Sequence, residues 1–435
     1  TKKEKSLFCK AKMIKNKLKD MKGKILISNG YKNFQMLISA YEVQKYNKLH
    51  SVISGYIPRS LFFKLIKIWP LNKSKKLKRI TERKNNIIDK KIINYLYGEI
   101  INEIIVKLRG KLKKKYKIFD LATQYVLKSY ALFAKKYLVE NHKDIKLYHY
   151  RAGFGGVSVD YAKSKNIKTI CDHTIAHPAI AQYMVANKGK FPKKKISIKN
   201  NWWKIVVSDI NKADIILVNS NFVKKTLIFM GCKKPIKVLY TGPGKGFEQN
   251  ISLKKKFFAN NNINILYSGG LIERKGLNEI QNVIKKFNFF DKINFELAGS
   301  LPLASKLKYK DLLNNKNVKY LGILNREDLN KCYKKADIFL FPSLVEGSAK
   351  VIFEAMASGC AVITTPNSGS IVEHNKGGFV VKAGNSYQLL KAIKKLTSNP
   401  KLIKKFGNYN KEIVKNNFRQ SHYGKRLNDF YKKFY

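Results

Sequence analysis

The chain has 435 residues and a formal net charge of +60 at pH 7, with 44% hydrophobic and 12% aromatic residues. This length predicts two or three domains, and this hydrophobic content excludes a disordered chain. Arginine supplies only nine of the 88 basic residues, so the charge is a lysine excess spread along the chain. Specific nucleic-acid binding requires a focused stripe or a known module, and none is present. A solvated basic surface is the first interpretation, and attraction to an anionic membrane face is the second.

The cysteines are scattered and form no CxxC pair, which predicts reduced thiols in a cytoplasmic protein. The basic charge adds the hypothesis that the protein is peripheral on the inner face of the membrane. Cysteine and histidine together give no metal-site spacing, so we expect no metal and no other cofactor. No apolar stretch reaches the roughly 20 residues of a membrane span, and there is no signal-peptide pattern. The five cysteines are Cys9, Cys171, Cys232, Cys332 and Cys360.

The first part of the chain predicts a Rossmann-like domain. Residues 1–20 are lysine-rich, and because the chain begins with Thr we hypothesise a natural start at Met21 or Met13, which would make them a non-native extension. Residues 24–30 read as the first strand and its turn, ending at Gly30. A helix over residues 34–45, a strand over 51–56, and later strands separated by helices are expected; these strands are 145–150, 169–173, 213–220 and 236–240.

Residues 58–117 predict a helical, basic insertion in this domain. Isoleucines from Ile87 to Ile105, with Leu96 and Leu108, keep one apolar face at helical spacing. Residues 61–69 mix apolar and aromatic side chains with lysines, as an interfacial helix does. A helix packed on its own domain is the alternative for that segment.

A glycine-dense stretch, residues 241–246, is the predicted hinge between domains, and a second Rossmann-like pattern follows it. Its strands are expected at 264–268, 294–298, 318–323, 337–341 and 377–381, with a helix from Leu277. From residue 386 onward the chain reads as helical. The predicted domains are therefore 21–243 and 244–405, with C-terminal helices over 406–435.

The stretch 341–365 predicts a strand–loop–helix–strand unit that carries the binding chemistry. Glu346 stands at the helix entry and Glu354 follows eight residues later, a rise of about 12 Å along a helix. Gly347 lets the backbone approach a ligand, and the free amides of the first helical turn favour an anion. This arrangement suits a sugar joined to a nucleoside diphosphate. Two solvated glutamates are the alternative.

These residues resemble the E-x7-E signature of the family-4 retaining glycosyltransferases. The resemblance extends to Tyr267 through Gly270, to Arg274 through Gly276, and to Asn367 through Ser370, and it covers residues 205–385 well. It implies the GT-B fold, in which two Rossmann-like α/β domains face each other across a cleft. It also implies an acceptor-side first domain, a donor-side second domain, and a last helix that crosses back to the first.

Roles in the donor domain follow from the resemblance. Arg274 and Lys275 would bind the diphosphate and replace a divalent metal. Glu346 would contact the sugar hydroxyls and Glu354 the ribose hydroxyls. The main chain near Ile323 would face the base. The remaining donor contacts are expected from Gly270 and from the segment in which Ser348, Ala349 and Lys350 replace the family's usual Phe-Gly-aliphatic run; they are Gly347, Ser348, Ala349 and Lys350.

In the first domain, His173 ends a strand where relatives carry a histidine near the reacting sugar. His177 follows closely and is an alternative, and a structural histidine remains possible for each. His149 and Arg151, before the glycine turn at 153–156, are expected to touch the acceptor. Gly30 resembles the family's glycine loop.

The sequence thus predicts a metal-independent retaining glycosyltransferase. It would move a sugar from a nucleoside diphosphate to a glycan or lipid-linked acceptor in cell-envelope polysaccharide or lipopolysaccharide synthesis. A nucleotide-sugar epimerase of the same fold is one alternative. A non-catalytic basic protein that binds membrane surfaces or nucleic acid is the other.

Overall fold

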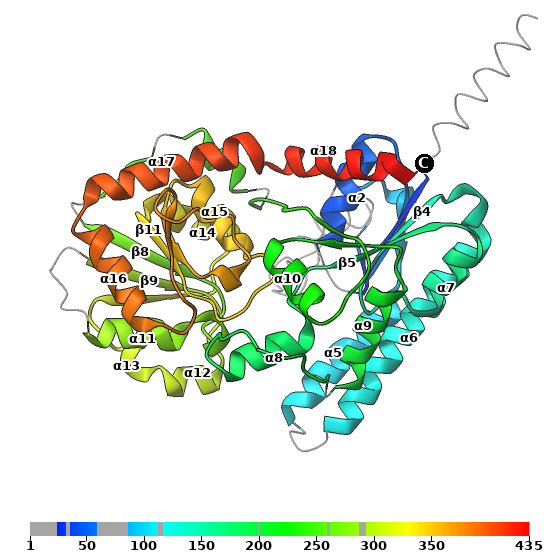
Figure 1. The fold of residues 1–435 in the computed structure, drawn as a ribbon, viewed down its shortest axis with the longest axis horizontal. Helices are drawn as coiled ribbons and strands as arrows, with labels where there is room; N and C mark the ends of the chain where they lie inside the picture. Colours follow the sequence, from blue (N-terminus) through cyan, green and yellow to red (C-terminus); the bar gives the residue numbers. More distant parts are fainter. Residues whose placement is uncertain are drawn as a thin grey trace, which may run out of the picture.

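The computed structural model describes residues 24–31, 35–58, 86–111, 116–198, 200–244, 246–253, 255–258, 262–286 and 293–434. These residues form two α/β domains, each built on one parallel sheet (Figure 1). The prediction of two Rossmann-like domains is confirmed. Residues 1–20 and the candidate interfacial segment 61–69 lie outside the described part of the chain.

The first sheet has the strand order β3-β2-β1-β4-β5-β6-β7, and its strands run parallel. The order reverses between β1 and β4, and the carboxyl ends of strands at such a switch point are where doubly wound sheets bind ligands. The strands are β1 (Ile25–Ser28), β2 (Leu49–Ser54), β3 (Ile92–Asn94), β4 (Leu147–Arg151), β5 (Lys168–His173), β6 (Ile215–Val218) and β7 (Ile236–Val238).

Helices cover both faces of this sheet, which explains why its inner strands are continuous apolar runs. One buried cluster joins the sheet to α6, α7 and α9, and another joins it to α2. The helices and 3₁₀ turns of this domain are α2 (Met36–Lys45), η2 (Asp89–Lys91), α5 (Leu96–Lys111), α6 (Tyr116–Asn141), η3 (His142–Asp144), α7 (Gly156–Ser164), α8 (Pro178–Ala186), α9 (Asn201–Lys212) and α10 (Asn221–Phe229).

The second sheet repeats the plan with the order β10-β9-β8-β11-β12-β13. Its strands are β8 (Ile263–Ser268), β9 (Ile293–Ala298), β10 (Val318–Gly322), β11 (Ile338–Phe341), β12 (Ala361–Thr364) and β13 (Gly378–Val380). The helices are α11 (Leu277–Lys286), α12 (Leu303–Lys308), α13 (Lys310–Leu313), α14 (Arg326–Lys335), α15 (Lys350–Ala357), α16 (Ser386–Thr397) and α17 (Pro400–Asn417), with 3₁₀ turns η4 (Glu248–Ile251), η6 (Glu273–Lys275) and η7 (Pro366–Ser368).

The C-terminal helices run along both domains, α17 on the second and α18 (Gln420–Tyr431) on the first, followed by the turn η8 (Lys432–Phe434) (Figure 1). Phe406 and Val414 of α17 lie in the core of the second domain. The hydroxyl of Tyr423 in α18 is 2.7 Å from Ser39 Oγ of α2. The crossing therefore occurs between α17 and α18, within the predicted C-terminal segment 406–435, whose first residue falls inside α17.

Within the described residues, the prediction of a continuous helical section over residues 58–117 is wrong for residues 86–95 and right for Leu96–Lys111. Ile92 and Ile93 belong to β3, which pairs with β2, and α5 begins only at Leu96. A short buried strand and a buried helical turn both read as an apolar run, so the isoleucine spacing did not distinguish them.

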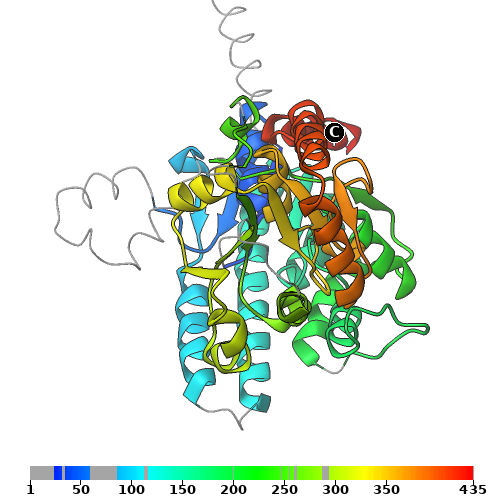
Figure 2. The ribbon, with the colours of Figure 1, turned by 90° about the vertical axis from the view of Figure 1, so that its left-hand side faces the viewer.

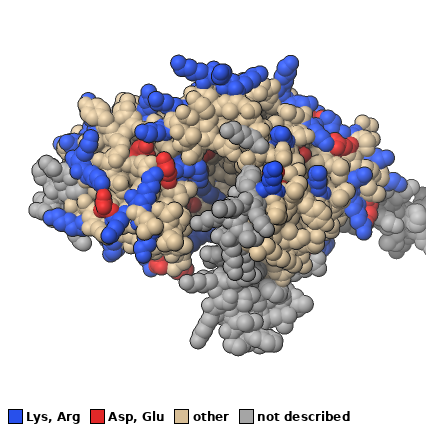
Figure 3. Space-filling model, turned by 90° about the horizontal axis from the view of Figure 1, so that it is seen from below, with Lys and Arg blue, Asp and Glu red and all other residues tan. Residues whose placement is uncertain are grey.

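Basic side chains are spread over both halves of the underside, around a recess between them (Figure 3). They form no single stripe on that face, in keeping with a lysine excess along the whole chain. Among the described helices, none is long and apolar enough to cross a membrane.

The packing of α18 on the first domain gives a stability prediction. Leu427 is fully buried in the cluster that joins α18 to α2 and β1. We expect Leu427→Ala to lower the free energy of unfolding by about 2–4 kcal/mol, because it leaves a cavity. Lys432→Ala, which removes only an exposed ion pair with Asp429, should change it by less than about 0.5 kcal/mol. Urea unfolding followed by circular dichroism measures both, and equal effects would contradict the assigned packing.

Candidate active site

A cluster of three charges lies at the carboxyl ends of the neighbouring strands β8 and β11. Arg274 Nη1 is 2.7 Å and Lys275 Nζ 3.3 Å from Glu346 Oε1. Arg274 Nη1 also donates to the Val345 carbonyl at 2.8 Å, and the Leu344 amide donates back to the Arg274 carbonyl at 2.9 Å. The turn after β8 is thus bonded to the loop after β11, which fixes both cations beside one carboxylate.

Glycine at position 276 permits this contact. Gly276 has a φ of +83°, and a Cβ there would lie 2.2 Å from the carbonyl oxygen of Pro342. A side chain would force the Arg274–Lys275 turn away from the loop that carries Glu346.

The same loop is pressed against the first domain. A Cβ on Gly347 would lie 1.8 Å from the Thr174 carbonyl oxygen, so only glycine allows the two backbones to meet. Ser220 Oγ, in the first domain, donates to the Gly347 carbonyl at 2.5 Å. Val345 packs with Ile180 of α8 in a buried apolar cluster. Because Thr174 directly follows His173, the structure brings Glu346 and His173 to the same interdomain junction.

The helix that follows is shorter than its predicted form. α15 begins at Lys350, so Glu346 through Ala349 form an extended loop and Glu354 lies within the helix. The 12 Å helical separation of the two glutamates is therefore wrong. In the loop, Glu346 and Ala349 donate their amides to the carbonyls of Asn367 and Ser368. The amides of Gly347, Ser348 and Lys350 have no hydrogen-bond partner among the described residues, which suits an anion.

Glu354 is a buried carboxyl group in a mixed environment. It is 7% exposed, and Tyr333 donates its hydroxyl to Glu354 Oε2 at 3.4 Å. Burial raises its pKa from an ordinary value of 4.5 to about 7, although nearby Lys350, Tyr333 and Arg326 oppose the rise. Burial also lowers the pKa of Lys350. Both groups are therefore largely removed from water, where electrostatic interactions with a bound hydroxyl or phosphate group are stronger than in solvent.

The two remaining predicted donor contacts, Gly270 and Ile323, follow β8 and β10. The carbonyl of Gly270 accepts a hydrogen bond from Tyr267 at 2.8 Å, in the turn just before Arg274. Ile323 follows β10 with 70% of its surface exposed, and no described contact joins it to the charge cluster.

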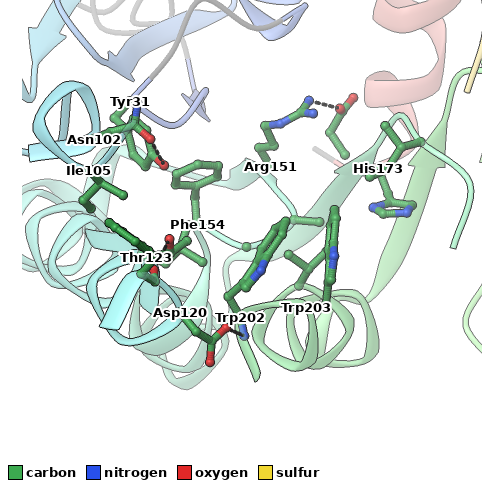
Figure 4. Close-up of a pocket in the computed structure, with 17 residues that line it drawn as sticks. Tyr31, Asn102, Ile105, Asp120, Thr123, Arg151, Phe154, His173, Trp202 and Trp203 are labelled. Atoms are coloured by element: carbon green, nitrogen blue, oxygen red, sulfur yellow. Dashed lines mark hydrogen bonds and ion pairs between the residues drawn. The ribbon is translucent and has the colours of Figure 1, made fainter. Parts of the chain in front are cut away.

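The first domain contributes the ends of β4 and β5. His173, which ends β5, is 2% exposed, and its Nε2 has no hydrogen-bond partner among the described residues. Burial lowers its pKa to about 3, with Arg151 and His177 adding to the effect, so the imidazole is neutral at pH 7. Arg151 Nη1 lies 3.6 Å from Asp172 Oδ1 (Figure 4). Burial raises the pKa of Asp172 to about 6, and Arg151 opposes that rise.

The other acceptor-side candidates are less accessible. His149 is fully buried beneath α18 and bonded to the Tyr431 hydroxyl, so its side chain offers no surface to a substrate in this conformation. His177 is the N-cap residue of α8, and burial lowers its pKa to about 4. Gly30 has a φ of +86° and donates its amide to the Tyr130 hydroxyl at 3.0 Å, with the ring of Phe154 against its Cα.

A cavity of about 330 Å³ extends from His173 and Arg151 into the first domain (Figure 4). Its walls come from α5, α6, α9 and the loop after β4. Trp202 and Trp203, whose stacked rings have centroids 3.7 Å apart, form one side. Asp120 of α6 accepts a long hydrogen bond from the Trp202 amide at 3.4 Å. Further lining side chains are Tyr31, Asn102, Phe119, Thr123 and Phe154.

A buried aspartate holds the glycine turn that borders this cavity. Asp209 of α9 accepts hydrogen bonds of 2.8 Å from the amides of Gly153, Gly155 and Gly156. Burial raises the pKa of Asp209 to about 6 despite these three bonds. Arg151, His173 and the turn at 153–156 were predicted from the sequence, whereas Asp209 and the cavity walls from α5, α6 and α9 were not. The consecutive tryptophans were the available signal, since the chain has only three tryptophans.

Among the described residues, no group of three or more His, Cys, Asp or Glu side chains is arranged to hold a metal ion. Cys171, Cys232, Cys332 and Cys360 are free thiols.

Glu354 gives a prediction with a defined pH window. Because its pKa is raised in the folded state, folding binds an extra proton between pH 4.5 and about 7, and stability falls as pH rises through that window. Above pH 7 the cost of burying the ionised group is present in full, on the order of 3 kcal/mol. Glu354→Gln should therefore raise the melting temperature at pH 8 and leave it nearly unchanged at pH 4. An increase that does not depend on pH would contradict the assignment.

Asp209 gives a second stability prediction, in which the substitution destabilises the protein. Asp209→Ala leaves three buried amides without an acceptor, and we expect a loss of about 3–5 kcal/mol in the free energy of unfolding. Asp160→Ala, which removes an exposed partner of Lys212 on the neighbouring α7, is the matched control and should cost less than about 1 kcal/mol. Urea titration of both variants measures the difference, and a small loss for Asp209→Ala would show that the turn does not need this carboxylate.

Comparison with known proteins gives the same picture for the second domain. Residues 248–413 match the family model described as glycosyl transferases group 1. The capsular polysaccharide biosynthesis glycosyltransferase CapM of Staphylococcus aureus is 28% identical over 239 residues, which are 51% of this chain and 62% of that protein. The amylovoran biosynthesis glycosyltransferase AmsK of Erwinia amylovora is 28% identical over 195 residues, or 42% and 47% of the two chains. The chain thus spans about half to three fifths of these relatives' lengths.

Solved structures extend the likeness over the whole fold. A glycosyltransferase from Rickettsia africae has a TM-score of 0.61 at 17% identity, over 95% of this chain and 98% of that one. HepE of Anabaena, solved in complex with UDP, has a TM-score of 0.61 at 15% identity, over 94% and 100% of the two chains. The chain has the GT-B fold of these glycosyltransferases, and its residues 248–413 carry the sequence pattern of glycosyl transferases group 1.

Proposed function

We propose that the chain is a retaining, metal-independent glycosyltransferase of family 4 that takes its sugar from a nucleoside diphosphate. The observation that carries the proposal is the junction at Gly347, where Glu346 and its two cations meet the segment after His173. An anionic leaving group, a sugar and an acceptor must converge at one place for glycosyl transfer. HepE is solved with UDP and with UDP-glucose, which supports a uridine nucleotide as the first donor to test.

In this proposal Arg274 and Lys275 take the charge of the diphosphate. In the free protein they share Glu346, which holds both cations together before a ligand arrives. The unpartnered amides at the start of α15 add donors for phosphate or sugar oxygens. Stabilising the negative charge that develops on the departing phosphate is commonly a large part of such catalysis.

The transfer step breaks the bond between the anomeric carbon and the β-phosphate oxygen. The acceptor oxygen bonds to the same face of that carbon, and its proton passes to the departing phosphate, so the configuration is retained. His173 is neutral and has an unpartnered nitrogen, which suits a hydrogen bond to a sugar hydroxyl rather than charge stabilisation. Glu346 would orient the sugar, and Glu354 the ribose.

The acceptor would enter the cavity lined by Trp202, Phe119 and Phe154, which His173 also lines. Aromatic walls suit the faces of sugar rings or a hydrocarbon chain. CapM and AmsK are named for capsular polysaccharide and amylovoran biosynthesis, and this supports a glycan or lipid-linked acceptor in cell-envelope polysaccharide synthesis.

A donor screen tests the proposal. The purified chain would be incubated with UDP-, GDP-, ADP- and dTDP-sugars in EDTA, and release of nucleoside diphosphate would be measured. We expect one donor to be turned over. Lys275→Ala should lower kcat by about 10²–10³-fold, because it removes a cation from the leaving-group site. Lys308→Ala is the matched control, since Lys308 forms an exposed ion pair with Glu273 next to the site and should leave kcat unchanged.

The alternatives give different outcomes. A nucleotide-sugar epimerase would change the sugar without an acceptor, and NMR of the product sugar would detect it. A non-catalytic protein would release no nucleotide. Loss of all turnover in EDTA that returns with a divalent cation would contradict the metal-independent mechanism. An inverted anomeric configuration in the product would contradict retention.

A further inference from the structure

We propose that the outer face of the α5–α6 hairpin is a docking surface for an anionic lipid bilayer. This hairpin surface consists of exposed large apolar side chains on two successive helices of the first domain. They are Leu96, Tyr97, Ile100, Ile104 and Leu108 on α5, and Ile118, Leu121, Tyr125, Leu132 and Val139 on α6. These ten are half of the twenty exposed large hydrophobic side chains in the described part of the chain, so exposed apolar side chains are concentrated on this surface.

The spacing makes the surface continuous. Leu96, Ile100, Ile104 and Leu108 recur every four residues, so they form one stripe along α5. The two helices pack against each other, and the hydroxyls of Tyr97 and Tyr125 lie 3.3 Å apart. The stripe of α5 therefore adjoins that of α6, and tyrosines at their junction suit the boundary between lipid and water.

The charge of this surface indicates which kind of partner binds there. Lys117, Lys128 and Lys136 are exposed on α6 among the apolar positions, and the exposed acids described on the two helices are Glu103 on α5 and Glu140 on α6. In sequence, residues 96–141 contain ten Lys or Arg and four Asp or Glu. A lysine-rich apolar face suits anionic lipid. A second copy of the chain would bring like charge against like charge, and nucleic acid would leave the apolar stripe unsatisfied.

The position of the hairpin suits the same interpretation. In two perpendicular views α5 and α6 extend side by side beyond the sheet of the first domain, away from α17 and α18 (Figures 1 and 2). Their inner faces line the cavity through residues such as Ile105, Phe119 and Leu127. The two helices that carry the docking surface therefore also form part of the cavity wall. If the proposed function holds, the acceptor would then be a lipid-linked saccharide presented from that bilayer.

Vesicle sedimentation tests the docking surface. The full chain would be mixed with vesicles of equal parts phosphatidylglycerol and phosphatidylcholine, and with phosphatidylcholine alone. We expect binding to the anionic vesicles that weakens at high salt, where the Debye length falls from about 10 to 3 Å. The double variant Ile100→Gln, Leu121→Gln should bind at least about tenfold more weakly, because it removes two side chains from the lipid contact. Leu303→Gln with Leu307→Gln, exposed leucines on α12, is the matched control and should bind like the wild type.

Circular dichroism and UDP binding in the donor domain serve as independent readouts of folding. Absence of wild-type binding to anionic vesicles would overturn the proposal, as would equal binding of the hairpin variant and the wild type. If the wild type is a dimer that does not bind vesicles, and the hairpin variant is a monomer, the surface contacts a second copy of the chain. That result would also overturn the proposal. Vesicle binding without nucleotide-sugar turnover would leave the docking surface standing and remove the proposed function.

Discussion

The contact between Gly347 and Thr174 is the constraint on which the active-site geometry depends. Two backbones from different domains meet where a single methyl group would lie 1.8 Å from a carbonyl oxygen. The Ser220 hydroxyl and the apolar cluster around Val345 hold the same junction from either side. As a result Glu346 and His173, which are 173 positions apart in sequence, border one site. Without this approach the two sheets would still fold, but the cluster at Arg274 would lose its partner domain.

Burial at the site follows one pattern. Glu354, Asp172 and Asp209 all have raised pKa values because each carboxyl group is removed from water. Their partners are few and fixed: a tyrosine, an arginine and three backbone amides. Such desolvated groups reduce the stability of the free protein, and shifted pKa values of this kind are typical of binding and catalytic sites. Three backbone amides donate to the Asp209 carboxylate, so its burial has a structural explanation. Glu354 has no comparable set of donors.

The fold was predictable because its elements are strongly patterned. The strands Ile263–Ser268 and Ile338–Phe341 are mostly buried apolar runs, and each is followed directly by a turn residue, Gly269 or Pro342. The turn at Arg274 and the loop at Glu346 were found because short charged motifs follow those strands. β3 was missed because a three-residue strand has the same composition as the helix after it. The cavity walls from α5, α6 and α9 were missed, because only the folded sheet brings these helices to the ends of β4 and β5.

The central claim is that a nucleoside diphosphate binds between the turn at Arg274 and the loop that carries Glu346. Hydrogen–deuterium exchange with and without UDP tests it most directly. The account predicts slower exchange in peptides that cover residues 269–277 and 344–354, because ligand contacts and backbone hydrogen bonds would hold both segments. Protection confined to other segments, or no protection at saturating UDP, would contradict it.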